Sequence, residues 1–581
     1  MAAAYRTVER EFDRDTASAI AERLGVSRLQ AQLLAQRGAI PESAAEYLSP
    51  LDRVLPDPGS MPGVKEAAAA ILAAARAGEH IVVFGDYDCD GVCATAIMLG
   101  AIAAVQCADA PAPAAFLPKR LDEGYGMTQR SLERMLADNP DVQLVVTVDN
   151  GINSVDEIAW LNAGHGVRTI VTDHHLPGDT LPRCEAIVNP MLPDAGWPED
   201  SRNLCGAGVA FFIAYEMVLL ARASGGYCGP KISGPMLVLA GIATVTDLMP
   251  LCGVNRAIVA KALDRFRSQA PIGMRELLNR ASRSGATKLT SRDFGFLIGP
   301  RMNAAGRMAD ATEALELATT CDREIARECA RIVDLRNTER KNVEFAMSEE
   351  ALSQIVPGAP AQVISLATGH LGVAGIVASR VLERLSSIPG CVPAPVCVLV
   401  NGRGSARAPA GYNVRDAFAE AAEALERFGG HAAAGGVSVK PGMTTRFVEL
   451  FSAACLRQSA AAGFPSAGDI VVDAFVSPDD LSIDFVEWLS SMEPFGEGNP
   501  EPVFAARGVR LKDLRTIGAD GRHLQFGMEG WSGVRAVWWN GGAEIERLRV
   551  DGARGVDVAF SAQVSGYGGP HVDLRIVAPP R

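Results

Sequence analysis

Three carboxylates on alternate residues follow a short apolar run near position 85. Asp86, Asp88 and Asp90 lie in the segment GDYDCDG, which comes directly after Ile81–Phe84. Like charges this close repel one another, so a fold that keeps them together must gain something from a further group. A divalent cation fits, because hard oxygen ligands suit Mg²⁺ and Mn²⁺. A solvated acidic loop is the alternative for this segment taken alone.

Two later segments repeat the arrangement of an apolar run that ends in polar side chains. The segment VVTVDNG contains Asp149, and the segment TIVTDHH ends in His174 and His175, the only adjacent pair among eight histidines. Neighbouring strands of a parallel sheet end at one edge, so we expect the three segments to meet in one crevice. A tandem histidine pair beside acidic strand ends favours metal binding over a structural role.

A fourth segment, LAGIATVTDLMPL, carries a single acid, Asp247, at the end of an apolar run. A lone charge in such a run needs a partner if it is buried, which makes Asp247 a candidate for the same crevice. The alternative is a helix cap or a turn, since Pro250 follows closely.

The order of expected elements predicts an α/β fold in several parts. Strands and helices alternate from about residue 61 to 255, which is typical of a parallel sheet covered by helices; one helix is expected at Val92–Val105. The span Asp322–Leu352 has no helix breaker and suits a long connecting helix. We expect an N-terminal helical segment (1–60), a parallel-sheet lobe (61–255), a helical connector (256–355), a smaller α/β lobe (356–460) and a small β-barrel with Gly-rich turns (466–581).

Composition excludes several other classes of protein. A chain of 581 residues with 48% hydrophobic residues can bury several cores and is not disordered. Its twelve cysteines form no Cys-x-x-Cys pair, so neither a zinc ribbon nor a thioredoxin-like site is expected. The first residues carry charges where a signal peptide needs an apolar core, and no uninterrupted apolar run reaches about 18 residues. We therefore expect a cytoplasmic protein with no membrane span.

The net charge of −13 is unusual for a protein that binds a polyanion. Phosphate contacts need positive potential at the site and not a positive total, and bound metal ions would neutralise part of the acidic cluster. Local sources of positive charge are expected from basic residues in the connector and the second lobe: Arg301, Arg307, Arg336, Arg340, Lys341, Arg403 and Arg407.

The four acidic segments together resemble the DHH phosphoesterase superfamily and, within it, the RecJ family of single-strand-specific 5′→3′ DNA exonucleases. The resemblance continues through the segments GPRMNAAGR (299–307), GVAGIVASR (372–380) and GGHAAAGG (429–436). It implies a DHH lobe at 61–255, a DHHA1 lobe at 356–460 and an OB-like domain at 466–581. It also implies hydrolysis of single-stranded DNA to 5′-mononucleotides in DNA repair and recombination. The partners that it suggests are single-stranded DNA, a single-strand-binding protein and a RecQ-type helicase.

The resemblance and the ligand types together predict a site for two Mn²⁺ or Mg²⁺ ions. Mixed imidazole and carboxylate ligation favours Mn²⁺, and Asp149 is the expected bridge between the ions. Asp86 is the acid that we expect outside the inner ligands, and His175 is either a ligand or a donor to the phosphoryl oxygen. The expected metal ligands are Asp86, Asp88, Asp90, Asp149, His174 and Asp247, and the expected catalytic residues are Asp88, Asp149, His174 and His175.

Substrate contacts are expected in the connector and the second lobe, where glycines and basic side chains can approach phosphates. The matching residues are Arg301, Asn303, Arg307, His370, Ser405, Arg407, Gly430 and His431. The chain departs from the family at Ala408, where a hydroxyl is common, and at Gly369, where an aromatic residue is common. For the two glycine-rich segments the alternatives are a tight packing turn and a helix-capping turn.

Two other functions remain open at this point. One is a phosphoesterase of the same superfamily acting on very short oligonucleotides or cyclic dinucleotides, although such relatives resemble only the first two lobes. The other is a catalytically inactive RecJ-like scaffold, although such proteins have lost metal ligands and this chain keeps every matching one.

Overall fold

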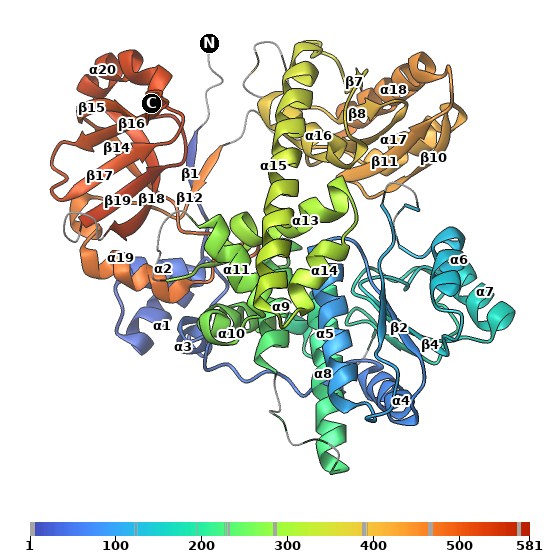
Figure 1. Ribbon diagram of the computed structural model, residues 1–581. Helices are drawn as coiled ribbons and strands as arrows, with labels where there is room; N and C mark the ends of the chain where they lie inside the picture. Colours follow the sequence, from blue (N-terminus) through green and yellow to red (C-terminus); the bar gives the residue numbers. More distant parts are fainter. Residues whose placement is uncertain are drawn as a thin grey trace. The chain divides into compact units, whose positions relative to one another are not determined.

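The structure is a computed structural model of the chain, coloured along the sequence in Figure 1. It describes residues 6–120, 123–124, 126–193, 196–225, 227, 229, 233–282, 288–385, 388, 391, 393–462, 469–565 and 571–580. The chain divides into two compact units. The first unit contains Pro56–Met249 and residues 262–462 of the described chain. The second contains the N-terminal residues up to Leu55, Pro250–Lys261 and the C-terminal part from 469 onward.

A five-stranded parallel sheet organises the first lobe of the first unit. Its strand order is β3-β2-β4-β5-β6, so β2, β4 and β5 are direct neighbours. Every residue of β2 and β4 is buried. Strands covered on both faces do not alternate between apolar and polar residues, which explains their continuous apolar sequences. The strands are β2 (Ile81–Phe84), β3 (Ala114–Phe116), β4 (Leu144–Val148), β5 (Arg168–Thr172) and β6 (Ala186–Val188).

Helices cover both faces of this sheet, as Figure 1 shows. On one face, α6 and α7 pack over a core that includes Phe84, Leu132 and Leu161. On the other face lie α4, α5 and α8, of which α5 and α8 are apolar around nearly their whole circumference because α9 packs on them as well. The helices are α4 (Val64–Ala77), α5 (Cys89–Val105), α6 (Gln129–Asp138), α7 (Val155–His165), α8 (Gly206–Ala223) and α9 (Gly234–Thr246).

Helix α8 is long and apolar enough to cross a membrane by length and composition. However, 72% of that 18-residue stretch is buried inside the fold. A core helix covered by its neighbours passes the same test, so this helix is weak support for a membrane span.

The connector is helical, as the sequence predicts. The span expected to form one long helix is α15 (Arg323–Ser353), and Asp322 caps its first turn by accepting from the backbone N–H groups of Glu324 and Ile325. The preceding elements are α10 (Gly253–Gln269), α11 (Ile272–Ala281), α12 (Ser291–Asp293), the π-helical turn η3 (Phe294–Ile298), α13 (Gly299–Met308) and α14 (Thr312–Thr319).

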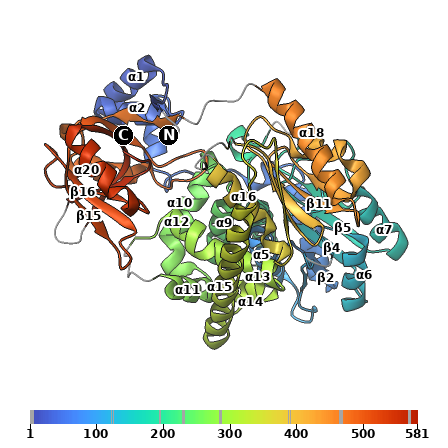
Figure 2. The same ribbon diagram turned by 90° about the horizontal axis from the view of Figure 1, so that it is seen from above.

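A second, smaller α/β lobe completes the first unit. Its five-stranded sheet has the order β10-β11-β9-β8-β7, with only β7 and β8 parallel. Helices α16 and α18 lie on opposite sides of β11 in the view from above (Figure 2). The elements are β7 (Gln362–Leu366), α16 (Leu371–Leu385), β8 (Val396–Val400), β9 (Arg403–Arg407), α17 (Val414–Glu420), β10 (Leu425–Gly430), β11 (Ala434–Val439) and α18 (Thr444–Ala462).

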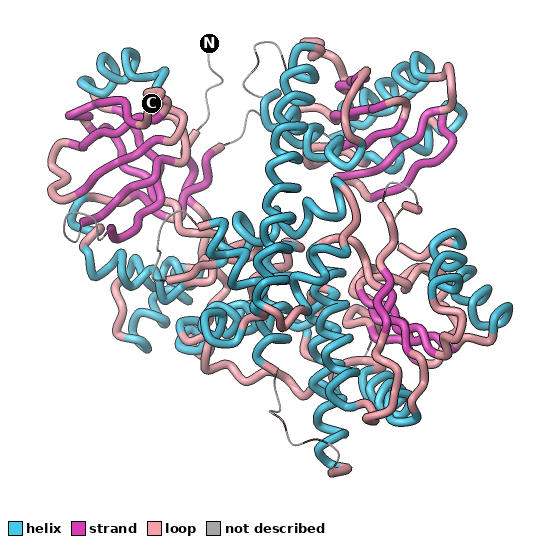
Figure 3. The backbone as a smooth tube through the Cα atoms, viewed as in Figure 1, coloured by secondary structure: helices cyan, strands magenta, loops and turns pink. Residues whose placement is uncertain are grey.

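The second unit joins the two ends of the chain. A mixed seven-stranded sheet, drawn in magenta with the other sheets in Figure 3, has the order β13-β14-β18-β19-β17-β16-β15. Its strands are β13 (Ala474–Phe475), β14 (Phe504–Val509), β15 (Leu511–Ile517), β16 (His523–Met528), β17 (Val534–Trp538), β18 (Val556–Ser565) and β19 (His571–Ile576). Helices α19 (Ile483–Leu489) and α20 (Ile545–Arg554) accompany this sheet.

The N-terminal helices pack with this C-terminal β domain. Strand β1 (Thr7–Glu9) pairs in parallel with β12 (Ile470–Val472), and the buried carboxylate of Asp473 pairs with Arg10 and Arg37. The helices themselves are α1 (Arg14–Leu24), α2 (Arg28–Ala35) and α3 (Ala44–Leu48). The predicted fold class is confirmed: a parallel-sheet lobe, a helical connector, a smaller α/β lobe and a C-terminal β domain.

Candidate metal centre

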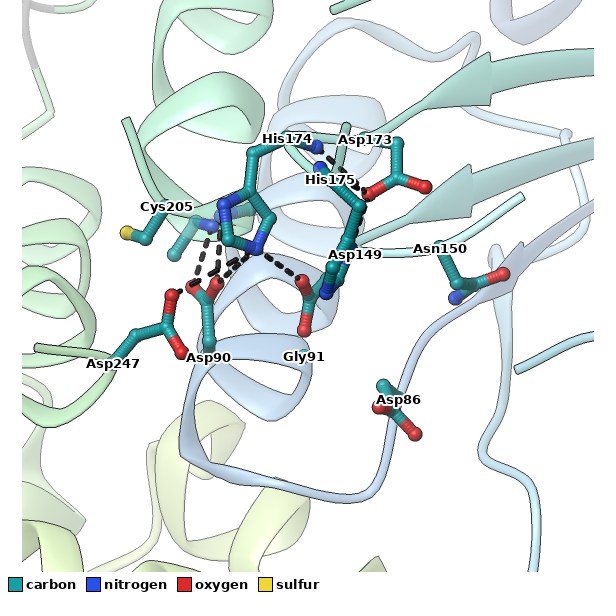
Figure 4. A network of polar contacts seen from close by, with 12 residues as sticks. Asp86, Asp90, Gly91, Asp149, Asn150, Asp173, His174, His175, Cys205 and Asp247 are labelled. Carbon is teal, nitrogen blue, oxygen red and sulfur yellow. Dashed lines mark hydrogen bonds and ion pairs between the residues drawn. The ribbon is translucent and has the colours of Figure 1, made fainter. Parts of the chain in front are cut away.

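The acidic segments gather at the carboxyl edge of the parallel sheet because β2, β4 and β5 are adjacent there. Asp86 follows β2, Asp149 follows β4 and His174 follows β5. Asp247 comes from a different kind of element, since it ends helix α9. Figure 4 shows these side chains together.

His174 lies among three carboxylates. Its Nε2 atom is 3.1 Å from Oδ1 of Asp149, 3.7 Å from Oδ2 of Asp90 and 3.7 Å from Oδ2 of Asp247. Four side chains from four separated segments thus lie together, and dashed lines in Figure 4 join the imidazole to the three carboxylates.

The described residues contain three sets of side chains that could each hold a metal ion. Within each set, the ligand atoms lie within 4.8 Å of one another. Neighbouring sets share Asp149 or His174, which is the pattern expected of adjacent ions with a shared ligand. The sets are Asp86, Asp88 and Asp149; Asp149, His174 and His175; and Asp90, His174 and Asp247.

The electrostatics disfavour the ionised form of these carboxylates when no cation is beside them. Burial, and then the charge of Asp88, raise the pKa of Asp86 to about 8. Burial and the charge of Asp90 likewise raise the pKa of Asp247 to about 8, and the same two causes raise the pKa of Asp149 well above its ordinary value. Without a positive partner, the cluster can persist only by taking up protons at neutral pH.

Two buried oxygens test the fit of a metal directly. Oδ1 of Asp149 and Oδ2 of Asp247 accept no hydrogen bond although both are shielded from solvent. An unsatisfied buried acceptor is costly, and both atoms face the His174 imidazole. The donor set of carboxylates with one or two imidazoles suits Mn²⁺ and accommodates Mg²⁺, so the residues fit the predicted metal.

Helix α8 fixes the position of Asp90. Both carboxylate oxygens of Asp90 accept backbone N–H groups at the start of this helix, from Gly206 at 2.6 Å and Ala207 at 2.7 Å. Gly206 is needed because a Cβ atom at this position would lie 2.5 Å from Cβ of Asp149. Asp149 itself has φ of 63°, a left-handed conformation that is uncommon outside glycine and that often occurs at functional sites.

Asp173 is a positioning residue that the sequence reasoning did not single out. Its Oδ1 atom lies 2.7 Å from Nδ1 of His175 and accepts the backbone N–H groups of His174 and His175. Its Oδ2 atom accepts the N–H of Ile152. Although burial lowers the pKa of His175, the hydrogen bond with Asp173 raises it to about 9. Its position immediately before the histidine pair is the sequence feature that could have indicated this role.

The connector braces the first acidic segment. Oδ1 of Asn303 accepts the backbone N–H of Cys89 at 2.7 Å, between Asp88 and Asp90. A Cβ atom at Gly306 would lie 2.3 Å from the carbonyl oxygen of Tyr87, so α13 can approach only with glycine there. The structure thus places Asn303 against the metal-binding segment. Arg301, by contrast, is paired with Asp334 at 2.8 Å.

A cationic cluster lies beside the metal centre. The guanidinium of Arg120 lies 5.2 Å from the ring centroid of Tyr87, which stands between Asp86 and Asp88. Burial, and then the charge of Arg120, lower the pKa of Arg307 to about 10, and the same causes lower the pKa of Arg407. Among the described residues, none of these three arginines forms an ion pair with a carboxylate. Arg120 is a further residue that the sequence reasoning missed, because no motif contains it.

The second lobe supplies the other predicted contacts. Ser405 and Arg407 share one face of β9, and a Cβ atom at Gly375 of α16 would meet both side chains. His370 precedes α16, and burial and the charge of Arg120 lower its pKa. Gly430 ends β10 and His431 follows it in the hairpin that joins β10 to β11, so this segment is not the helix-capping turn considered as its alternative. The structure therefore brings Arg307, His370 and Arg407 together, and it places His431 on an exposed turn.

Comparison with known proteins agrees with this fold and centre. The DHH family, N-terminal domain, matches residues 80–241, and the RecJ OB domain matches residues 472–577. The chain therefore contains one segment similar to each of these two domain families.

The chain is 34% identical to the single-stranded-DNA-specific exonuclease RecJ of Escherichia coli (strain K12), with 93% of each chain covered. It is 31% identical to the corresponding Bacillus subtilis (strain 168) protein over 93% of this chain and 66% of that one. The crystal structure of RecJ from Thermus thermophilus in complex with Mn²⁺ superposes with a TM-score of 0.80 at 30% identity, covering 99% of this chain and 78% of that one. For the same protein in complex with Mg²⁺ the TM-score is 0.75 at 28% identity, with the same coverage. The chain belongs to the RecJ family, which confirms the resemblance noted in the sequence.

Proposed function

We propose that this protein is a metal-dependent exonuclease that degrades single-stranded DNA from its 5′ end and releases 5′-mononucleotides. The observation that carries the proposal is the direct neighbourhood of a buried anionic centre and a partly buried cationic cluster, joined through Tyr87 and Arg120. A phosphodiester with divalent cations satisfies both regions at once. Membership of the RecJ family supports the same activity and substrate class.

The residues around the metal centre have distinct tasks in this proposal. Asp86, Asp88, Asp90, Asp149, His174 and Asp247 hold two Mn²⁺ or Mg²⁺ ions, with His175 as a further ligand or as a donor to a phosphoryl oxygen. Such ions supply an activated water and stabilise the attacking and leaving oxygens of an in-line displacement. Asp173 keeps the His175 ring in one orientation and makes it more basic.

The cationic cluster binds the phosphates of the strand. The guanidinium groups of Arg307 and Arg407 are held by the backbone carbonyls of Gly372 and Ala406, at 3.2 Å and 2.8 Å, so their positions are set before the substrate arrives. Preorganised cations next to the reacting centre orient the phosphodiester and favour charge that develops during the reaction.

The two alternative functions are less consistent with the chain. A phosphoesterase for very short substrates needs neither the long connector nor the C-terminal RecJ OB domain. An inactive scaffold does not require a set of buried carboxylates whose pKa values are raised by burial and by the charges of their neighbours. A cytoplasmic location, a role in repair and recombination, and cooperation with a single-strand-binding protein and a RecQ-type helicase are further parts of the proposal.

The test is digestion of single-stranded DNA labelled at its 5′ or its 3′ end, in Mn²⁺, with a duplex of the same sequence as control. The proposal predicts immediate release of labelled mononucleotide from the 5′-labelled strand only, with the duplex left intact. Cleavage restricted to di- to pentanucleotides would favour the short-substrate phosphoesterase. Tight binding of the strand without cleavage would favour the scaffold.

A further inference from the structure

A buried carboxylate joins the helical connector to the second lobe. Glu344 lies on α15, and 11% of its side chain is exposed. Its Oε1 atom accepts from Nε of Arg380 on α16 at 3.0 Å, and its Oε2 atom accepts from Nη1 of Arg340, one turn earlier on α15. Since removal of one partner from a buried ion pair leaves an uncompensated charge, the position of α16 on α15 depends on this carboxylate.

Helix α16 approaches two arginines of the cationic cluster. Nη1 of Arg307 donates to the carbonyl oxygen of Gly372 at 3.2 Å, and a Cβ atom at Gly372 would lie 2.3 Å from the carbonyl oxygen of Arg307. A Cβ atom at Gly375 would lie 2.9 Å from Nη2 of Arg407. Arg307 belongs to the connector and Arg407 to the second lobe, so the position of α16 sets the spacing between the two guanidinium groups.

The same carboxylate lies near the cluster, where its charge by itself is unfavourable for a polyanion. Burial and the charge of Arg120 lower the pKa of Arg307 to about 10, and the charge of Arg340 contributes to this shift, which places Arg340 near Arg307. Arg340 is held by Glu344 and by Oδ1 of Asn337, the latter at 3.2 Å. A carboxylate close to a phosphate-binding cluster repels DNA, so attraction of the substrate does not explain it. Its two arginine partners, on two different helices, indicate a role in alignment.

We propose that Glu344 is a positioning residue that anchors α16 on the connector, so that Arg307 and Arg407 meet the same segment of the bound strand. This inference rests on the proposed exonuclease function. Glu344 itself binds neither metal nor phosphate. Its contribution is the fixed spacing of two cations from different lobes, which orients the phosphodiester at the metal centre.

The substitution Glu344→Gln separates alignment from simple electrostatics, because the two predict changes of opposite sign. Removal of a negative charge near the cluster should by itself strengthen the binding of single-stranded DNA and raise kcat/KM. Loss of the anchor should instead lower kcat/KM on single-stranded DNA by about tenfold, with the circular dichroism spectrum unchanged. An unchanged or raised kcat/KM would overturn the inference.

Matched variants on α16 control for charge and for folding. Glu383→Gln removes an exposed carboxylate that also lies near Arg380, at 3.8 Å, and it should leave kcat/KM unchanged. If Glu344→Gln does not fold, Arg380→Gln removes the α16 side of the anchor at a position where 59% of the side chain is exposed. It should lower kcat/KM by about fivefold, whereas Arg384→Gln, the same change at an exposed position of the same helix, should not. Equal effects of these two arginine variants would overturn the inference.

A double-mutant cycle with Arg407→Gln shows whether Glu344 acts through the cluster. In the Arg407→Gln background, Glu344→Gln should lower kcat/KM by less than about twofold, because one of the two cations to be aligned is already absent. Additive losses would show that Glu344 acts independently of the cluster and would overturn the inference. If the original protein failed to cleave single-stranded DNA, the proposed function itself would fail, which is a different outcome.

Discussion

The metal centre and the cationic cluster are neighbouring regions of opposite charge. In both, burial and repulsion between like charges shift the pKa values of the side chains. In the first, burial and mutual repulsion raise the pKa values of Asp86, Asp149 and Asp247. In the second, burial and mutual repulsion lower the pKa values of Arg307 and Arg407. Each region is unfavourable by itself, and each becomes favourable when it binds a ligand of opposite charge.

The difference between the regions lies in how they can respond when the ligand is absent. Carboxylates in the metal centre can take up protons, because pKa values near 8 are within reach of neutral pH. The arginines remain charged even at a pKa of about 10. The metal-free centre should therefore be sensitive to pH, whereas the cationic cluster should be sensitive to salt.

The largest effect is expected from the substitution Asp149→Asn. It removes the carboxylate shared by two of the ligand sets and keeps a side chain that tolerates the left-handed backbone. Turnover should fall by at least about 10³-fold, because the metal centre supplies most of the stabilisation of the reacting phosphate. Steady-state hydrolysis of single-stranded DNA measures this loss, and circular dichroism checks that the fold is retained. Turnover within tenfold of the original would remove Asp149 from the site.

The second largest effect is expected in the pH dependence of the free energy of unfolding of the metal-free protein. Between the unfolded pKa near 3.8 and the folded pKa of about 8, Asp86 and Asp247 bind more protons in the folded state than in the unfolded state. In a chelator, the free energy of unfolding should therefore fall as pH rises, by on the order of 2 kcal/mol for each of the two groups between pH 6 and 8.

Denaturant titrations at several pH values measure this slope. Saturating Mn²⁺ should reverse it, because metal binding favours the deprotonated carboxylates. A metal-free protein whose stability rises over the same range would contradict the electrostatic account of the centre.

A smaller loss is expected from Asp173→Asn, which acts through His175. Removal of the carboxylate takes away the hydrogen bond and the nearest negative charge that oppose the effect of burial on the His175 ring, so its pKa should fall from about 9. We expect a 10- to 100-fold loss of kcat with a shifted pH profile. The matched control is Asp179→Asn, the same change at an exposed position six residues further on. A loss of kcat without any change in the pH profile would indicate a purely structural role.

The smallest effect is expected in the cationic cluster, from Arg407→Gln. Loss of one phosphate contact should weaken single-strand binding about tenfold and reduce the slope of log K against log salt by about 0.7. Arg446→Gln, in the same lobe but exposed and paired with Glu423, should change neither quantity. An unchanged salt slope in Arg407→Gln would show that Arg407 does not meet a phosphate.

The gathering of the candidate metal ligands could be predicted from sequence because their signals are local. Asp86, Asp149 and His174 each follow an apolar strand, and the rule that parallel strands end at one edge then brings them together. The prediction that these residues meet at one edge does not require the order of the strands in the sheet. The structure adds that β2, β4 and β5 are direct neighbours.

The supporting contacts could not be predicted because they join residues that are far apart in the chain. Asp90 and Gly206 are separated by 116 positions. No local sequence pattern predicts that the backbone N–H of Gly206, at the start of a helix, donates to the Asp90 carboxylate. Asp473 and Arg37 are separated by 436 positions, so the packing of the N-terminal helices on the C-terminal β domain was not visible either. Such contacts form only when the chain folds, and in the sequence each partner is a single residue without a recognisable pattern around it.

The measurement that tests the central claim most directly is calorimetric titration of Mn²⁺ into the metal-free protein in two buffers of different ionisation enthalpy. The account predicts saturable binding of two ions with release of protons at pH 7, since carboxylates with raised pKa values must deprotonate to bind metal. It also predicts that Asp149→Asn loses this binding. Absence of saturable Mn²⁺ binding, or equal binding by the variant, would contradict the account.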